Sequence, residues 1–300
     1  MQKDKISVIM PVYNAADTVS ETLDSLLVQT YGNFEVLAVD DGSTDSSRDI
    51  IRKYAAEDGR IRLIERETNG GVAAAINTGL GLADGEFIAR IDADDLARPY
   101  RFQKQVDFFR QHPEVGILGG GYAPFREDGT GFEAFHPTDC LELAWRFVTN
   151  TYFCHPSVMF RRGVFEAMGD YPKVEAEDFA YFSEAIKLFR GANLPEILID
   201  YRESPQNRSN SAADRIAKSV RVQARRNYEY YLGPKDGNFE LFFAYQHDRR
   251  LTWRDWIKIE KINCTILNKL VKQCKISRCS KSFLTLRMRI VFEGFQKILR

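Results

Sequence analysis

The sequence predicts an α/β fold with a mostly parallel central sheet flanked by helices and a basic, helical C-terminal extension. Over the first 120 residues, short β-branched runs alternate with segments of helical periodicity. The runs are apolar throughout, which is typical of parallel strands covered on both faces. Two of the runs end in aspartates, at the carboxyl ends where such sheets bind ligands.

Each expected element follows from local pattern. The apolar runs predict strands over 6–11, 34–40, 61–65 and 86–92. Helical spacing predicts helices over 16–29, 71–83 and 99–111. It also predicts a helix that ends at about residue 56 and that either Ser43 or Thr44 could cap.

The alternation weakens beyond residue 120. There we expect a hairpin turning at Asp128 and Gly129, a strand over 155–160, a helix over 176–190 ended by Gly191, a strand over 196–202 and a helix over 211–231. The run "LGPKDGN" breaks the chain. We therefore expect a catalytic domain over 1–232, with a nucleotide-binding part (1–120) and an acceptor-binding part (121–232), and an extension over 233–300.

Charge is unevenly distributed along the 300 residues. Lys+Arg and Asp+Glu both number 42, but residues 249–300 carry 14 basic and 3 acidic side chains, which leaves the rest at −11. Helical spacing would gather apolar residues of this segment on one face with basic groups around it, which fits an anionic membrane surface. A helical bundle packed on the catalytic domain or on a partner fits nearly as well. We expect no nucleic-acid partner, because no binding motif accompanies the charge.

Localisation follows from two further features. Five cysteines without C-x-x-C spacing indicate neither a disulfide framework nor a zinc site. No apolar run reaches the ~18 residues of a membrane span. We expect a cytoplasmic protein, peripheral on the inner face of the cytoplasmic membrane.

Three carboxylates crowd the end of the fourth strand, in "IARIDADDLARP". Asp92 and Asp94 could face one ligand, and a Mg²⁺ or Mn²⁺ ion would offset their repulsion. An acidic turn followed by a helix cap, with Asp95, fits the spacing equally well. Asp40 and Asp41 end a neighbouring strand on the same rim, where an Asx-turn before Gly42 is the plainer reading.

Four ordered blocks carry a resemblance that covers about residues 5–205. They are "SVIMPVYNAADTVSETLDSLLVQTYGNFEVLAVDDGSTDSS", "NGGVAAAINTGLGLADGEFIARIDADDLARP", "HPSVMFRR" and "AEDFAYFSEAIKLFRGANLPEILIDYR". Together they resemble the family 2 inverting glycosyltransferases, which have the GT-A nucleotide-diphosphosugar transferase fold. More narrowly, the chain is similar to bacterial transferases that extend lipooligosaccharide or polysaccharide chains, including β-1,3-N-acetylglucosaminyl transferases.

The resemblance implies a donor site. Pro11, Val12 and Tyr13 would form the uracil-binding stretch, with the Tyr13 ring as a stacking face. Asp41 would accept a hydrogen bond from the base. Asn69 and the two glycines after it open a helix, where backbone N–H groups could approach an anion of the donor or simply form a tight turn.

The resemblance also implies how the diphosphate is held. Asp92 and Ala93 would lie against the ribose and diphosphate, and Asp94, with Asp92, would hold Mn²⁺ or Mg²⁺. The cation would stabilise the charge that develops on the leaving diphosphate.

Inverting transfer also needs a base. Asp178 matches the base of the family's E-D motif, with Glu177 beside it to orient acceptor or base. Without the resemblance, both read as first-turn acids at a helix N-terminus.

Other contacts are less specific. Arg90, His155 and Arg208 could touch donor or acceptor. Arg90 could instead merely balance the charge of the aspartates, and His155 taken alone reads as a structural histidine. Many relatives end this block with Tyr-Arg-x-His, but Ser204 stands at the histidine position here. The metal site would then depend on Asp94, phosphates and water.

The sequence therefore predicts a metal-assisted inverting transferase. It would move a hexosyl or N-acetylhexosaminyl group from a UDP-sugar to a hydroxyl of a growing bacterial surface glycan, free or lipid-linked. The alternative is a non-catalytic, membrane-associated scaffold of the same fold that binds nucleotide or glycan. A nicotinamide oxidoreductase fits poorly, because the first strand leads into "PVYNAADT" and not into G-x-G-x-x-G.

Overall fold

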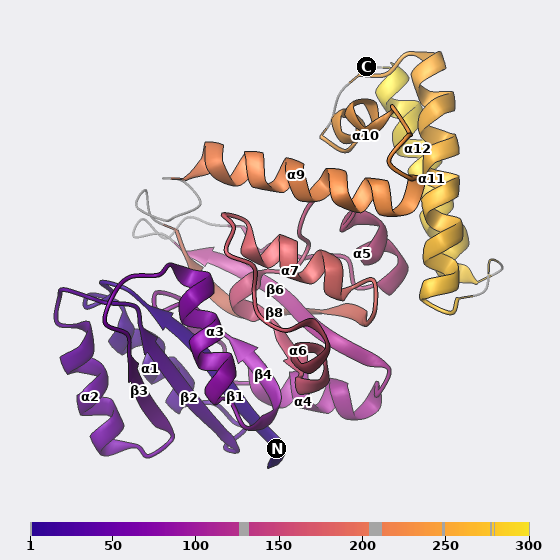
Figure 1. The fold of residues 1–300 in the computed structure, drawn as a ribbon. Coiled ribbons are helices and arrows are strands. Elements are labelled where there is room, and N and C mark those ends of the chain that lie inside the picture. Colours follow the sequence, from indigo (N-terminus) through magenta and orange to yellow (C-terminus); the bar gives the residue numbers. More distant parts are fainter. Residues whose placement is uncertain are drawn as a thin grey trace.

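The α/β prediction is confirmed. A computed structural model describes residues 2–125, 132–203, 212–247, 250–276, 278 and 280–299. Within them, one eight-stranded sheet has the order β3-β2-β1-β4-β7-β6-β8-β5 (Figure 1). The strands are β1 (Gln2–Val12), β2 (Phe34–Asp40), β3 (Ile61–Glu65), β4 (Gly85–Arg90), β5 (Leu96–Ala97), β6 (Val115–Phe125), β7 (Met159–Arg161) and β8 (Arg190–Arg202).

Helices cover both faces of the sheet. They are α1 (Val19–Leu27), α2 (Ser47–Glu57), α3 (Val72–Leu82), α4 (Arg101–Gln111), α5 (Cys140–Arg146), α6 (Arg162–Met168), α7 (Glu177–Ala185), α9 (Ala213–Leu232), α10 (Phe239–Gln246), α11 (Trp253–Gln273) and α12 (Lys281–Leu299), with a 3₁₀ turn, η1 (His155–Ser157). Side chains of α1, α2 and α4 share one apolar cluster, and those of α3, α5, α6 and α7 share another.

Alternate residues of the apolar strands explain these two clusters. Ile9 and Leu37 point into one, whereas Val8 and Val36 point into the other. A strand buried on both faces needs apolar residues at every position, so its sequence does not alternate.

The directions of the strands determine which segments of the chain lie together at one edge of the sheet. β1 runs parallel to β2 and β4, so the carboxyl ends of all three lie together. β7 is antiparallel to β4, which brings the segment before β7 to the same edge. β5 is antiparallel to β8, with Leu96 opposite Asp200, so the last residues of β8 also arrive there.

Two local predictions are wrong. Gly191 does not end a helix, because α7 stops at Ala185 and Gly191 lies inside β8. A Cβ at Gly191 would lie 3.0 Å from Cζ of Phe153, so the glycine serves close packing. Neither Ser43 nor Thr44 caps α2, which begins at Ser47; the Ser43 hydroxyl instead accepts a hydrogen bond from the N–H of Asn14 at 2.9 Å.

Three further elements differ from the prediction. The sequence pattern missed β6, α5 and α6. The strand expected over 155–160 is a 3₁₀ turn followed by the short β7. Around the expected hairpin, Tyr122 and Ala134 form an antiparallel bridge, while its turn at Asp128 and Gly129 lies outside the described residues.

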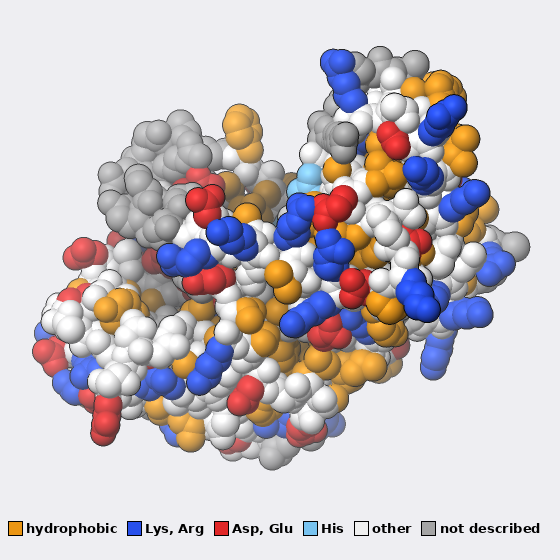
Figure 2. Space-filling view, turned by 45° about the horizontal axis from the view of Figure 1, so that its top comes forward, with side chains coloured by type: hydrophobic (Ala, Val, Ile, Leu, Met, Phe, Trp, Pro, Cys, Tyr) orange, Lys and Arg blue, Asp and Glu red, His pale blue; other side chains and the backbone are white. Residues whose placement is uncertain are grey.

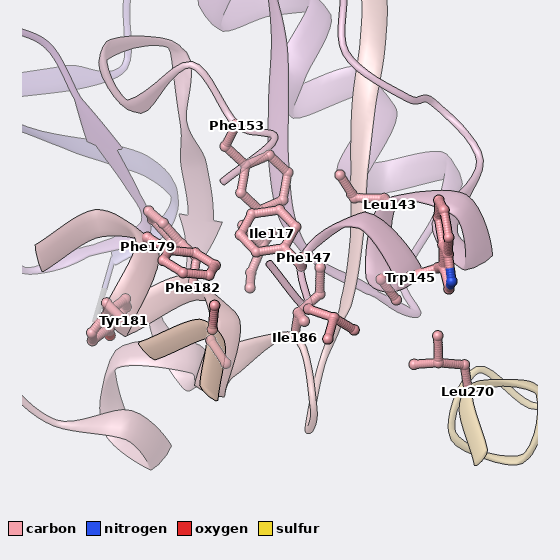
Figure 3. Close-up of a cluster of buried hydrophobic side chains, with 14 of the residues drawn as sticks. Ile117, Leu143, Trp145, Phe147, Phe153, Phe179, Tyr181, Phe182, Ile186 and Leu270 are labelled. Atoms are coloured by element: carbon pink, nitrogen blue, oxygen red, sulfur yellow. The ribbon is translucent and has the colours of Figure 1, made fainter. Parts of the chain in front are cut away.

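The C-terminal helices pack against the catalytic part through the larger apolar cluster. Figure 3 shows Leu270 of α11 facing Trp145 of α5, in a cluster that continues through Phe147 to Phe182 of α7. Helix α9 crosses over the sheet and leads into α10–α12 (Figure 1). No helix in the described part of the chain combines the length and apolarity needed to span a bilayer.

Candidate active site

Three carboxylates converge directly after β4. Oxygens of Asp92, Asp94 and Asp95 all lie within 4.8 Å of one another. Asp92 forms an ion pair with Arg90, the last residue of β4. Asp95 is fully buried, and its Oδ2 has no hydrogen-bond partner among the residues that the structure describes. This set of hard oxygen ligands suits a divalent cation such as Mg²⁺ or Mn²⁺.

Two acids of the cluster, Asp94 and Asp95, have raised pKa values. Burial raises the pKa of Asp94 to about 6, and the charge of Asp92 adds to this effect. Burial, with the charges of Asp92 and Asp94, raises the pKa of Asp95 well above its ordinary value. The cluster therefore carries excess negative charge in a buried setting, which a cation would neutralise.

Arg90 is influenced both by the acid cluster and by Glu177. Burial alone would lower the pKa of Arg90, but the charges of Asp92, Asp95 and Glu177 raise it above its ordinary value. Its guanidinium is almost completely buried. The positive charge of Arg90 is therefore stabilised by the acid cluster and by Glu177.

The candidate metal ligands and the candidate base line one cleft of about 530 Å³. Asp92 and Asp94 lie in its wall, and Glu177 and Asp178 enter from the first turn of α7. His155 of η1 lines the same cleft, with its ring 5.7 Å from that of Tyr171. One cleft thus brings together the two pairs of acids that the sequence singled out.

A second cavity, of about 680 Å³, adjoins this cleft. Its lining includes Arg146 of α5, Tyr152 and Arg289 of α12. His136 lines both hollows. The cleft therefore has an extension toward the C-terminal helices.

The side chains of Asp40 and Asp41 bind different parts of the structure. The Oδ2 of Asp40 accepts hydrogen bonds from the N–H groups of Gly42 and Ser43 at 3.2 and 3.1 Å and pairs with Arg48 at 2.6 Å, so it makes the expected Asx-turn. The Asp41 carboxylate instead reaches across to the loop before α3.

This loop is fixed to Asp41 through its backbone. Asp41 Oδ2 accepts a hydrogen bond from the N–H of Gly71 at 2.7 Å and from that of Gly70 at 3.1 Å, and Asp41 Oδ1 pairs with Arg66 at 2.7 Å. The loop also passes so close to Gly42 that a Cβ there would lie 2.9 Å from the N atom of Asn69. Asn69 is thereby held beside the strand ends.

The predicted uracil stretch ends β1 at the same edge. Val12 is buried, and its carbonyl accepts a hydrogen bond from the N–H of Asp41 at 2.8 Å, with Pro11 just before it. Tyr13 is 51% exposed, so its ring is available to a ligand. Ala93 is buried between the two aspartates that flank it, and Arg208 lies outside the described residues.

Sequence reasoning missed two arginines that build the site. Arg202 ends β8 and donates from Nε to the carbonyl of Asp94 at 3.0 Å. Arg101 is fully buried and donates from Nη2 to the carbonyl of Arg90 at 2.8 Å. Arg202 could have been found from the sequence, because it ends the run "EILIDYR" that resembles the family. No sequence signal indicates that Arg101 lies inside the core.

The fold and the family profile together define a glycosyltransferase of the GT-A type. The profile described as "Glycosyl transferase family 2" matches residues 7–169. Similar proteins include the provisionally named glycosyltransferase EpsE of Bacillus subtilis (strain 168), 37% identical over 66% of this chain and 73% of its own length. An uncharacterised glycosyltransferase of Haemophilus influenzae is 30% identical over 76% of this chain and 74% of its own. The chain therefore belongs to glycosyl transferase family 2.

Solved structures share the fold. S. aureus TarS in complex with UDP-GlcNAc superposes with a TM-score of 0.63 at 18% identity, covering 97% of this chain and 92% of that one. The mannosyltransferase PcManGT of Pyrobaculum calidifontis, in complex with GDP-Man and Mn²⁺, gives a TM-score of 0.57 at 20% identity, with 98% and 86% covered. At these identities the likeness establishes the architecture.

Proposed function

We propose that this glycosyltransferase moves a sugar from a UDP-sugar to a hydroxyl of a growing bacterial surface glycan, with inversion and with Asp178 as general base. The observation that carries the proposal is the shared cleft, whose lining includes both Asp92 and Asp94 and the pair Glu177 and Asp178. One set of groups would hold the leaving diphosphate and the other would activate the acceptor.

The proposed donor site lies at the edge of the sheet where β1 and β2 end. The exposed ring of Tyr13 would stack on uracil, and Asp41, already bonded to the loop at Gly70 and Gly71, would present its remaining acceptor capacity to the base. TarS has been solved with UDP and with UDP-GlcNAc, which supports a uridine nucleotide. PcManGT has been solved with GDP-Man, so the donor panel below includes guanosine nucleotides.

Asp94 and Asp92, with Asp95 behind them, would hold Mn²⁺ or Mg²⁺. The convergence of the three carboxylates and the raised pKa values of Asp94 and Asp95 fit a cation, and PcManGT has been solved with Mn²⁺. When bound, the ion would supply positive charge to the departing diphosphate. Arg90, which pairs with Asp92, would orient that carboxylate.

The base would be Asp178. Its carboxylate would take the proton from the acceptor hydroxyl as the oxygen attacks the anomeric carbon, and the bond from that carbon to the diphosphate oxygen breaks on the opposite face. The nearly buried Glu177 and the neighbouring Arg90 would position the acceptor and set the local charge. Attack and departure on opposite faces give the inversion.

The acceptor would enter through the hollow that His136 joins to the cleft. Tyr152 offers an aromatic face there, and Arg146 and Arg289 offer donors, which suits sugar rings and hydroxyls. TuaG of Bacillus subtilis, 37% identical over 44% of this chain, is provisionally named for teichuronic acid biosynthesis, which supports a surface glycan as acceptor. A lipid-linked acceptor would account for the basic C-terminal segment.

The test measures release of the nucleoside diphosphate from a panel of UDP- and GDP-sugars with Mn²⁺. We expect release with one UDP-sugar, which rises when an acceptor glycan is added. Asp178→Asn should lower turnover by about 100-fold or more while UDP binding, measured by calorimetry, stays within about twofold. Glu166→Gln, an exposed acid on α6, is the matched control. Normal turnover in Asp178→Asn would refute the base assignment.

The alternative function is a scaffold of the same fold that binds nucleotide without turnover. Two pairs of acids that line one cleft disfavour it, because a binding module has no need of a base. Mn²⁺-dependent UDP binding without turnover on any donor would favour the scaffold.

A further inference from the structure

An apolar stripe runs along the outer side of α12. Leu284, Met288, Phe292 and Phe295 recur at intervals of four, four and three residues, so they share one helix face. Their exposed fractions range from 41% to 67%. Such a row of large exposed side chains marks an interaction surface.

The stripe continues onto the start of α11. The ring of Trp253 lies 5.9 Å from that of Phe295, and Ile257 follows one turn later on α11. Trp253 is 55% exposed and Ile257 is 50% exposed. Six large apolar side chains from two helices therefore form one surface, which we call the α11–α12 stripe.

The stripe is not the face by which these helices pack on the rest of the protein. The opposite sides of the same helices are already buried, through Ile262 and Ile266 of α11 and Leu286 and Ile290 of α12. The two helices are in close contact at Gly294, where a Cβ would lie 2.6 Å from Nε1 of Trp256. Packing on the catalytic part is thus complete without the stripe.

Basic residues lie beside the α11 part of the stripe and at the start of α12. Arg254, Lys258 and Lys261 lie beside Trp253 and Ile257 on α11 and are exposed, and Lys281 begins α12. Residues 249–300 carry 14 basic and 3 acidic side chains. Figure 2 shows Lys and Arg side chains among hydrophobic ones over the C-terminal helices.

We propose that the α11–α12 stripe docks in the plane of an anionic membrane, with Met288 and Phe292 inserted among the acyl chains and the lysines on the headgroups. An apolar face with a basic rim and an interfacial tryptophan has the chemistry of such a surface. A second copy is disfavoured, because a two-fold contact would oppose two strongly basic segments.

The test measures co-sedimentation of the full chain with vesicles. We expect binding to phosphatidylcholine vesicles containing phosphatidylglycerol to be at least about tenfold tighter than to phosphatidylcholine alone, and weaker at high salt. The double variant Met288→Glu, Phe292→Glu should lose about tenfold or more. Val28→Glu with Leu188→Glu is the matched control, since these side chains are 61% and 69% exposed on the catalytic part.

A second variant separates charge from apolar insertion. Lys258→Gln with Lys261→Gln should reduce binding to the anionic vesicles several-fold, and Lys53→Gln on α2 should not. Circular dichroism checks that each variant is folded. The proposal is wrong if the wild-type chain ignores anionic vesicles, if the Met288 and Phe292 variant binds as well as wild type, or if the stripe variant instead turns a wild-type dimer into a monomer. Because the assay contains no sugar nucleotide, its result is independent of the proposed transferase activity.

Discussion

The carboxylate of Asp95 accepts a hydrogen bond from the main-chain N–H of Arg202 at 2.9 Å. Arg202 also donates from Nε to the carbonyl of Asp94 at 3.0 Å. These two bonds connect the acidic turn after β4 to the end of β8, more than 100 residues later in the chain. The acid cluster is therefore held from outside its own loop.

Replacing Arg202 tests this support. Arg202→Ala keeps the main-chain bond but removes the contact with the Asp94 carbonyl, so the acids should be less well oriented. We expect Mn²⁺ affinity to fall roughly 10- to 100-fold, the usual effect of removing a group that orients metal ligands. Calorimetric titration measures it. Arg52→Ala, at an exposed arginine of α2, should leave the affinity unchanged.

Neutralising Asp94 should have opposite effects with and without metal. Its pKa is raised to about 6 by burial and by Asp92, so the native protein binds a proton more tightly than the unfolded chain. Stability without metal should therefore fall as the pH rises from about 4 through 6. Asp94→Asn should remove this dependence and, at pH 7, stabilise the metal-free protein by about 1 to 3 kcal/mol.

Added Mn²⁺ reverses the comparison. The ion should raise the melting temperature of the wild-type protein and leave that of Asp94→Asn unchanged. Asp49→Asn, at an exposed acid, is the control. A full Mn²⁺ response in Asp94→Asn would remove Asp94 from the ligand set.

Asp41 should matter to stability as well as to the donor. Asp41→Ala leaves Arg66 and the N–H groups of Gly70 and Gly71 without their shared acceptor. We expect a loss of roughly 3 kcal/mol in the free energy of unfolding by urea, together with weaker UDP binding. Asp41→Asn should cost less, since its amide oxygen still accepts one backbone bond. Equal stability of the alanine variant and wild type would contradict this role.

His136, between the two hollows, predicts a pH dependence of its own. Burial lowers the pKa of His136 below its ordinary value, so folding favours the neutral ring. Its contribution to stability is complete above about pH 6.5 and is lost as the pH falls toward the lowered pKa. His136→Gln should therefore lose less stability between pH 7.5 and 5 than wild type. His112→Gln, at an exposed histidine, should follow wild type.

The nucleotide-binding half was predictable because its pattern is local. β2 and β3 have the predicted bounds, since apolar runs bounded by turn residues leave no other choice. The crowding of Asp92 and Asp94 likewise pointed to a ligand, and the structure places both in one cleft with Asp178.

The rest depends on contacts that are distant in sequence. β6 contains three consecutive glycines and reads poorly as a strand, yet it pairs along β8. Gly191 looked like a helix stop, although packing against Phe153 explains it. Arg101 is polar in sequence but lies in the core, where it bonds the carbonyl of Arg90. None of these partners lies close enough along the chain to leave a local signal.

Helix α9 sets the distance between the cleft and the C-terminal helices. It has 20 residues, which at the rise of an α-helix is a rod about 30 Å long. Ile216 and Val220, near its start, form part of the cleft wall, and its far end at Leu232 leads into the C-terminal helices. If those helices bind a bilayer, the length of α9 fixes how far the cleft lies from the bilayer surface. A saccharide anchored in that bilayer would need a minimum number of sugars to reach the cleft, and shorter chains would go unextended.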